Sequence, residues 1–139
     1  MGQQQLLLII LGVIVVGIAV AVGITMFQDN AVSANRDAVV NDLVNLSARA
    51  QQYYRRPASL GGGQNNFSGL NTNGISKLVN VPSGSTQWTN ANGTYVVLSA
   101  TDSNVVLEGT GNEIGNDGST KVKVTMTVKA TISLTTVNN

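Results

Sequence analysis

The chain has 139 residues and a formal net charge of +1, from eight Lys or Arg and seven Asp or Glu, and it contains no His and no Cys. Because the charge is near neutral and no basic cluster stands out, nucleic acid and anionic membrane surfaces are poor partners. The chain lacks imidazole bases and thiolates, and its carboxylates and serines stand in no catalytic motif, so we expect no enzymatic activity and no cofactor.

Residues 6–27, LLLIILGVIVVGIAVAVGITMF, form an unbroken apolar run whose single hydroxyl is Thr25. At ~1.5 Å rise per residue, a helix of this length is about 33 Å long and crosses a bilayer. Exposing its side chains to water at about 1.5–3 kcal/mol each costs tens of kcal/mol, so lipid or an assembly must cover it. We therefore assign its large apolar residues to a membrane or filament core: Leu6, Leu7, Leu8, Ile9, Ile10, Leu11, Val13, Ile14, Val15, Val16, Ile18, Val20, Val22, Ile24 and Phe27.

Three interpretations of this run stay open: a cleaved secretory signal, a plain single-span anchor, and a helix that moves from the membrane into an assembly. A signal typically has a basic start and a shorter apolar core, whereas this chain starts with three uncharged glutamines. Gly12, Gly17 and Gly23 are either the ordinary glycines of a membrane helix or soft points that unwind when the helix packs against copies of itself.

Residues 28–56 continue the same helix, because they contain no Gly or Pro before Pro57 ends it. Apolar residues recur at steps of three, four and seven, which is typical of one buried helix face: Val32, Val39, Leu43, Leu46, Ala50 and Tyr53. Asp29 and Arg36 lie on the same seam, too far apart to pair within one helix. They either face solvent or pair between copies shifted along the helix axis. Residues 1–56 thus predict one long helix, and we expect its first half to project beyond the globular domain that covers its second half.

Residues 57–139 predict a loop followed by an antiparallel β domain. We expect a loop at residues 57–73, strands at 75–81, 94–100 and 104–109, and a turn-rich loop at 111–119. Glu113, Asn116 and Asp117 in that second loop have oxygens that suit Ca²⁺, but they lack the EF-hand spacing and a turn explains them equally well. We therefore expect no metal site.

Residues 121–134 alternate strictly between polar and apolar side chains, which predicts a half-buried strand of unusual length, or two strands. Its apolar face comprises Val122, Val124, Met126, Val128, Ala130, Ile132 and Leu134. We expect this face to pack on Val39, Leu43, Leu46, Ala50 and Tyr53 of the helix. The predicted fold class is therefore α+β, one long N-terminal helix packed on a small C-terminal antiparallel sheet.

A short polar start, an apolar helix, its amphipathic continuation and a C-terminal sheet together resemble the layout of type IV pilins and of the pseudopilins of type II secretion. The resemblance implies a subunit held in the inner membrane and moved by assembly machinery into a helical filament outside the cell. Its partners are then copies of itself, with the helices in the core and the sheets outside. The family's leader is usually basic and ends in glycine; the only candidate for it here is Met1-Gly2, which has no basic residue, and Gln5 stands about where the family has a glutamate.

We therefore expect a structural filament subunit, with Gln5, Asp29 and Arg36 as candidate polar contacts between copies. One alternative is a pseudopilin that works as part of a secretion machine. Another alternative, from a different class, is a monomeric single-span protein whose sheet domain binds a ligand at the cell surface.

Overall fold

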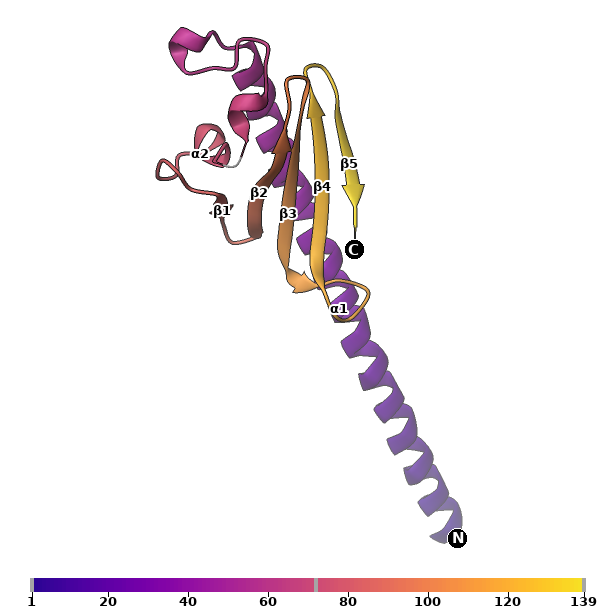
Figure 1. Cartoon of the computed structure of the whole chain (residues 1–139). Coiled ribbons are helices and arrows are strands. Elements are labelled where there is room, and N and C mark those ends of the chain that lie inside the picture. The colour runs from indigo at the N-terminus through magenta and orange to yellow at the C-terminus, as the bar shows by residue number, and fades with distance from the viewer. Residues whose placement is uncertain (1, 72, 139) are drawn as a thin grey trace.

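One long helix dominates the computed structural model, which describes residues 2–71 and 73–138 (Figure 1). This helix, α1 (Gly2–Arg55), has 54 residues, or about 81 Å at ~1.5 Å per residue. Its C-terminal half lies against one face of an antiparallel sheet, and its N-terminal half projects beyond the sheet. The expected α+β fold is confirmed. Met1, part of the candidate leader Met1-Gly2, lies outside the described residues.

Pro57 sets the end of α1. The Arg56 amide still donates to the Gln52 carbonyl at 3.1 Å, but Pro57 has extended backbone, with φ −60° and ψ 150°. Because proline disfavours helical geometry in the residue before it, α1 ends at Arg55, one residue before the expected boundary.

Three short helical segments connect α1 to the sheet: η1 (Ala58–Leu60), η2 (Ser68–Leu70) and α2 (Ile75–Leu78). The expected strand at residues 75–81 is wrong, because this stretch begins with α2. Ile75, Leu78 and Val79 are 0%, 5% and 9% exposed. Ile75 and Leu78 are three residues apart, which places them on one face of α2, whereas a strand would put them on opposite faces. Val79 follows the helix with extended backbone, at φ −129° and ψ 157°.

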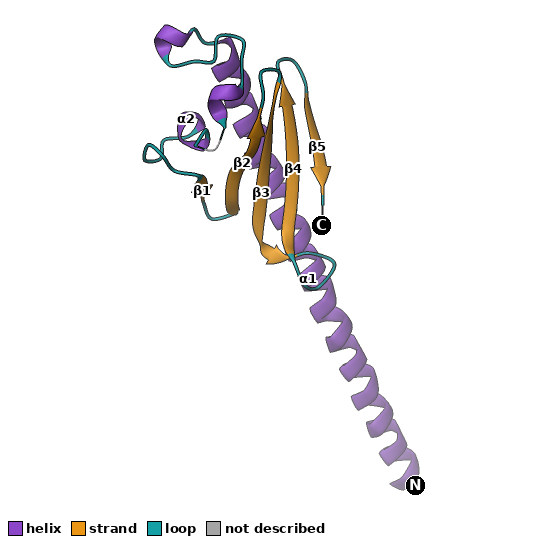
Figure 2. Ribbon diagram, viewed as in Figure 1, coloured by secondary structure: helices purple, strands orange, loops and turns teal. Residues whose placement is uncertain are grey.

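Within the described residues, five strands form one sheet in the order β1-β2-β3-β4-β5, with every neighbouring pair antiparallel (Figure 2). The strands are β1 (Gln87–Thr89), β2 (Gly93–Ala100), β3 (Asn104–Ile114), β4 (Lys121–Lys129) and β5 (Ser133–Val137). Because consecutive strands are neighbours, short reversals of the chain suffice to build the sheet.

The expected strands at residues 94–100 and 104–109 are confirmed as β2 and β3. β3 is longer than expected, because Gly111 still pairs with Gly93 of β2 and Ile114 pairs with Lys121 of β4. The turn-rich loop therefore starts after Ile114 rather than at Gly111. β1 was not expected, since its three residues are too few to show alternation.

Residues 121–134 form two strands, β4 and part of β5. The Lys129 amide donates to the Ile132 carbonyl at 2.7 Å and closes the turn between them. The apolar face of β4 is fully buried: Val122, Val124, Met126 and Val128 are each 0% exposed. Ile132 and Leu134 are each 56% exposed, because the alternation of β4 does not continue across the reversal.

Gly109 on β3 lies where α1 crosses the sheet. A Cβ atom at this position would lie 2.7 Å from Val39 Cγ1 and 2.9 Å from Tyr95 Cε1. Glycine therefore lets the side chains of α1 and β2 meet over β3, and any larger residue would push them apart.

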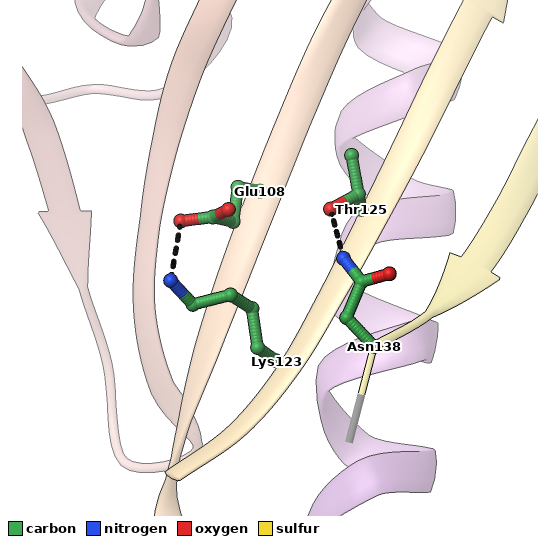
Figure 3. Close-up of polar contacts among 4 residues, drawn as sticks. All are labelled: Glu108, Lys123, Thr125 and Asn138. Atoms are coloured by element: carbon green, nitrogen blue, oxygen red, sulfur yellow. Dashed lines mark hydrogen bonds and ion pairs between the residues drawn. The ribbon is translucent and has the colours of Figure 1, made fainter. Parts of the chain in front are cut away.

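Polar contacts tie the strands together on the face of the sheet that points away from α1 (Figure 3). Lys123 Nζ of β4 lies 3.4 Å from Glu108 Oε1 of β3. Asn138 Nδ2 donates to Thr125 Oγ1 at 2.8 Å and fastens the end of β5 to β4. These partly exposed contacts each contribute little free energy, but they favour the observed register.

Candidate functional site

The N-terminal half of α1 lies outside the folded domain. Every large apolar residue from Leu6 to Phe27 is more than half exposed, from 52% at Val22 to 80% at Phe27. Among the described residues, α1 is the one helix long and apolar enough to cross a membrane. We call residues 6–27 the apolar rod.

The apolar rod has no polar group that needs water. Its single hydroxyl, at Thr25, donates to the Val22 carbonyl of the same helix at 2.8 Å, and the helix pairs its own backbone groups. Apolar side chains cover all sides, which is typical of a helix surrounded by lipid or by other apolar helices.

Gly12, Gly17 and Gly23 lie within the rod, and α1 continues through all three. A Cβ atom at any of them would meet nothing within 4 Å. No contact inside the single subunit therefore requires glycine at these positions. The idea that they are soft points concerns packing against other helices, and it stays a prediction.

The C-terminal half of α1 contributes one face to the hydrophobic core. The structure brings together the helix residues and strand residues named from the sequence: Val39, Leu43, Leu46, Ala50 and Tyr53 lie with Val122, Val124, Met126 and Val128 in one buried cluster. All are at most 8% exposed. At about 1.5–3 kcal/mol for each large buried side chain, this seam holds α1 to the sheet firmly.

A partly buried polar cluster lies beside this seam. The Asp42 carboxylate accepts hydrogen bonds at Oδ2 from Asn90 Nδ2 at 2.8 Å, Asn92 Nδ2 at 2.8 Å and Tyr95 Oη at 2.6 Å. We call these four residues the Asp42 cluster. Tyr95 is 0% exposed, so its hydroxyl depends on the carboxylate of α1 for its partner.

The Asp42 cluster shifts the pKa of both of its acidic groups. Burial alone raises the pKa of Asp42, but the hydrogen bonds from Asn92, Tyr95 and Asn90 together outweigh burial and hold this pKa below its usual value. Burial, together with the hydrogen bond to the charged Asp42, raises the pKa of Tyr95 well above its usual range. The cluster therefore favours an ionised Asp42 and a neutral Tyr95.

Asn35 makes a second polar join between α1 and the sheet domain. Its Nδ2 donates to the Asn92 carbonyl at 2.9 Å. Its Oδ1 accepts from the backbone amides of Asn112 at 3.1 Å and Glu113 at 3.3 Å. One helix residue thus holds the loop before β2 and the end of β3.

The structure does not bring the three polar residues named as contacts between copies together. Gln5 and Asp29 are exposed. Arg36 is partly buried, and its Nε has no hydrogen-bond partner among the described residues. Seven residues, or about 10 Å of helix, separate Asp29 from Arg36, so a pair between them would have to join two copies.

The loop after β3 is a hydrogen-bonded turn. Asp117 accepts from the backbone amides of Ser119 and Thr120, each at 3.0 Å, and from the Thr120 hydroxyl. In residues 2–71 and 73–138, no three His, Cys, Asp or Glu side chains gather to hold a metal ion. The bonds of Asp117 are those of a turn.

Sequence reasoning missed the Asp42 cluster and Asn35. Both helix residues lie beside the apolar seam, where a polar residue is typical of a solvated helix flank. Asn90 and Asn92 belong to a run of turn residues, and their side chains gave no sign of a partner on α1. Residues 95–98 are consecutive apolar side chains, so no alternation indicated which face of the strand buries Tyr95.

Comparison with protein-family models, curated proteins and solved structures finds no match for this chain. The likeness to pilins therefore rests on the layout itself, a long apolar N-terminal helix joined to a small antiparallel sheet. That layout is compatible with membrane anchoring through the apolar rod.

Proposed function

We propose that this chain is the structural subunit of a type IV pilus-like helical filament outside the cell. In this filament the apolar rods bundle in the core and the sheet domains face outward. The observation that carries the proposal is the apolar rod, which is exposed in the single subunit and has no polar face.

The exposed rod must find a cover. Burying a large apolar side chain contributes about 1.5–3 kcal/mol, so the rod as a whole accounts for tens of kcal/mol. The inner membrane covers it before assembly, and the rods of other copies cover it in the filament. Because one apolar surrounding replaces another, the transfer requires no exposure to water and packing between rods decides the outcome.

The rigid join between rod and sheet domain supports a filament over a simple tethered domain. α1 passes from the rod into the core without a break, and the buried seam, the Asp42 cluster and Asn35 hold it there. When two rods pack side by side, their sheet domains are therefore placed relative to one another. A tethered domain gains nothing from such stiffness, since reach to a ligand favours a flexible linker.

Electron microscopy of material sheared from cells tests this proposal. We expect thin filaments in which mass spectrometry identifies this chain as the main component. If the chain is found only in membranes and detergent extracts it as a monomer, the filament proposal fails. The alternative of a single-span surface domain then remains. Short assemblies confined to the periplasm would instead favour a pseudopilin.

A matched pair of substitutions separates the role of the rod from a general loss of apolar surface. Ile14 in the rod and Ile132 after β4 are 53% and 56% exposed. Ile14→Asp places a carboxylate in an apolar environment, which costs several kcal/mol or more, so we expect filaments to disappear. Ile132→Asp removes similar exposed apolar area outside the rod, and we expect filaments to remain.

A further inference from the structure

Two hollows of opposite charge lie at opposite ends of the sheet domain. From them we infer that copies of this chain join head to tail, the distal end of one copy seated against the rod junction of the next. This inference rests on the proposed filament and names the contact that sets its register.

The junction hollow lies where α1 leaves the sheet domain and has a volume of about 550 Å³. It is lined by residues of α1 between Phe27 and Val32, by the end of β3 and by the loop after it. Its charged groups are the carboxylates of Asp29 and Glu113, and no cation of the described residues lines it. Phe27 and Ile114, 80% and 51% exposed, make part of its wall apolar.

The distal hollow lies at the other end of the domain, between the last turns of α1 and α2, and has a volume of about 390 Å³. Arg49, Arg56 and Lys77 line it, and no carboxylate of the described residues does. Arg49 Nη1 donates to the Leu78 carbonyl at 3.0 Å. Lys77 Nζ donates to the Gly69 carbonyl at 2.7 Å.

The cations of the distal hollow have no carboxylate partner within one subunit. Among the described residues, the one ion pair is Lys123 with Glu108 on the sheet (Figure 3). The sequence explains this, because every charged residue between Asp42 and Asp102 is basic: Arg49, Arg55, Arg56 and Lys77. Cations without a carboxylate partner therefore gather around the distal hollow.

The distal end also presents an apolar side chain on a well-formed turn. Leu60 is 69% exposed. Its amide donates to the Pro57 carbonyl at 3.0 Å, and the amides of Gly61 and Gly62 bond to Ala58 and Pro57 at 3.0 and 3.1 Å. The distal end thus offers cations and an apolar side chain, and the junction hollow offers carboxylates and an apolar wall.

The spacing of the two hollows matches the length of the rod. Asp29 and Arg49 are twenty residues apart on one helix, or about 30 Å along its axis. A second copy seated at the junction hollow is therefore shifted by about 30 Å, and its sheet domain and its part of α1 run alongside the apolar rod, itself about 33 Å long. The contact joins two different surfaces and shifts each copy by about 30 Å along the helix axis. Because of that shift it cannot close into a ring, and its repetition builds a filament.

Charge complementarity between the two hollows determines the offset between neighbouring copies more than the affinity between them. Exposed ion pairs contribute little each, but a wrong offset places like charges against one another and is disfavoured. The rods then supply the attraction, and the two hollows select the offset.

Charge reversal tests the contact in cells that make filaments of the unmodified chain. The triple variant Arg49→Glu, Arg56→Glu and Lys77→Glu should reduce sheared filaments by about tenfold or more, a change of about 1.4 kcal/mol or more. Adding Asp29→Lys and Glu113→Lys to the same chain should restore them, because each copy then carries both reversed ends. The control instead reverses Lys121 and Lys129 on β4, which line neither hollow and form no ion pair among the described residues, and it should leave filaments near their normal amount.

Each outcome decides the inference. Loss in the triple variant with rescue in the five-residue variant supports the head-to-tail contact, and the rescue also shows that the substituted domain still folds. Normal filaments in the triple variant, no rescue, or equal loss in the control overturns the contact, while the filament proposal stands. Absence of filaments from the unmodified chain is a separate result and contradicts the proposed function itself.

Discussion

Replacing Asp42 by alanine removes the acceptor at the centre of the Asp42 cluster. Three donors lose their partner: the amides of Asn90 and Asn92 and the hydroxyl of Tyr95. The two asparagines are partly exposed and can bond to water, whereas Tyr95 is fully buried. The variant therefore leaves one buried hydroxyl without an acceptor.

The cost follows from these exposures. A buried donor left unsatisfied costs about 1–3 kcal/mol, and each partly exposed amide that exchanges a carboxylate for water adds about 0.5 kcal/mol. We expect Asp42→Ala to lower the free energy of unfolding by about 2–4 kcal/mol. Tyr95→Phe, which removes the hydroxyl and leaves two donors on the carboxylate, should cost less, about 1–2 kcal/mol.

Urea unfolding of the full chain in detergent micelles measures both costs. Trp88 is the single tryptophan, and its ring lies 5.1 Å from that of Tyr95, so its fluorescence reports on this part of the core. In the double variant the orphaned hydroxyl is gone, and the combined cost should fall short of the sum by about 1–2 kcal/mol. Additive costs, or a loss under about 0.5 kcal/mol for Asp42→Ala, would show that the carboxylate is solvated and the reasoning wrong.

The remaining predictions concern the same join between α1 and the sheet. Gly109→Ala should destabilise by about 1–3 kcal/mol in the same assay, because its Cβ would press on Val39 and Tyr95; an unchanged midpoint would contradict the close approach. Leu43→Asp buries a carboxylate at a position that is 0% exposed, so we expect loss of protease resistance in the sheet domain, and a variant as resistant as the unmodified chain would refute the seam. Because the pKa of Asp42 is lowered on folding, its stabilisation is fully present above about pH 4 and is lost as the pH falls through the lower folded pKa. In Asp42→Asn the free energy of unfolding should fall less steeply as the pH is lowered below about 4. An equally steep fall in both chains would contradict the lowered pKa of Asp42.

Much of the fold could be predicted from patterns among residues close together in the sequence. The apolar run, the seam from Val32 to Tyr53 and the alternation over β4 each depend on neighbours within one turn or one strand, so periodicity alone revealed them. The prediction of a strand at residues 75–81 was wrong for a related reason. A short apolar run is compatible with a strand or a helix, and its local pattern does not decide between them.

Part of the candidate site could likewise be predicted from the sequence, and part depends on the tertiary structure. The sequence by itself determined that residues 6–27 form an apolar rod that water cannot cover, since that follows from composition and length. Only the tertiary structure decided where Asp42 finds its partners, because Tyr95 lies 53 residues away in the chain, and that two hollows of opposite charge face opposite ends of the domain. Such contacts depend on how the strands stack against α1, and no local pattern of residue types encodes a meeting between segments so far apart.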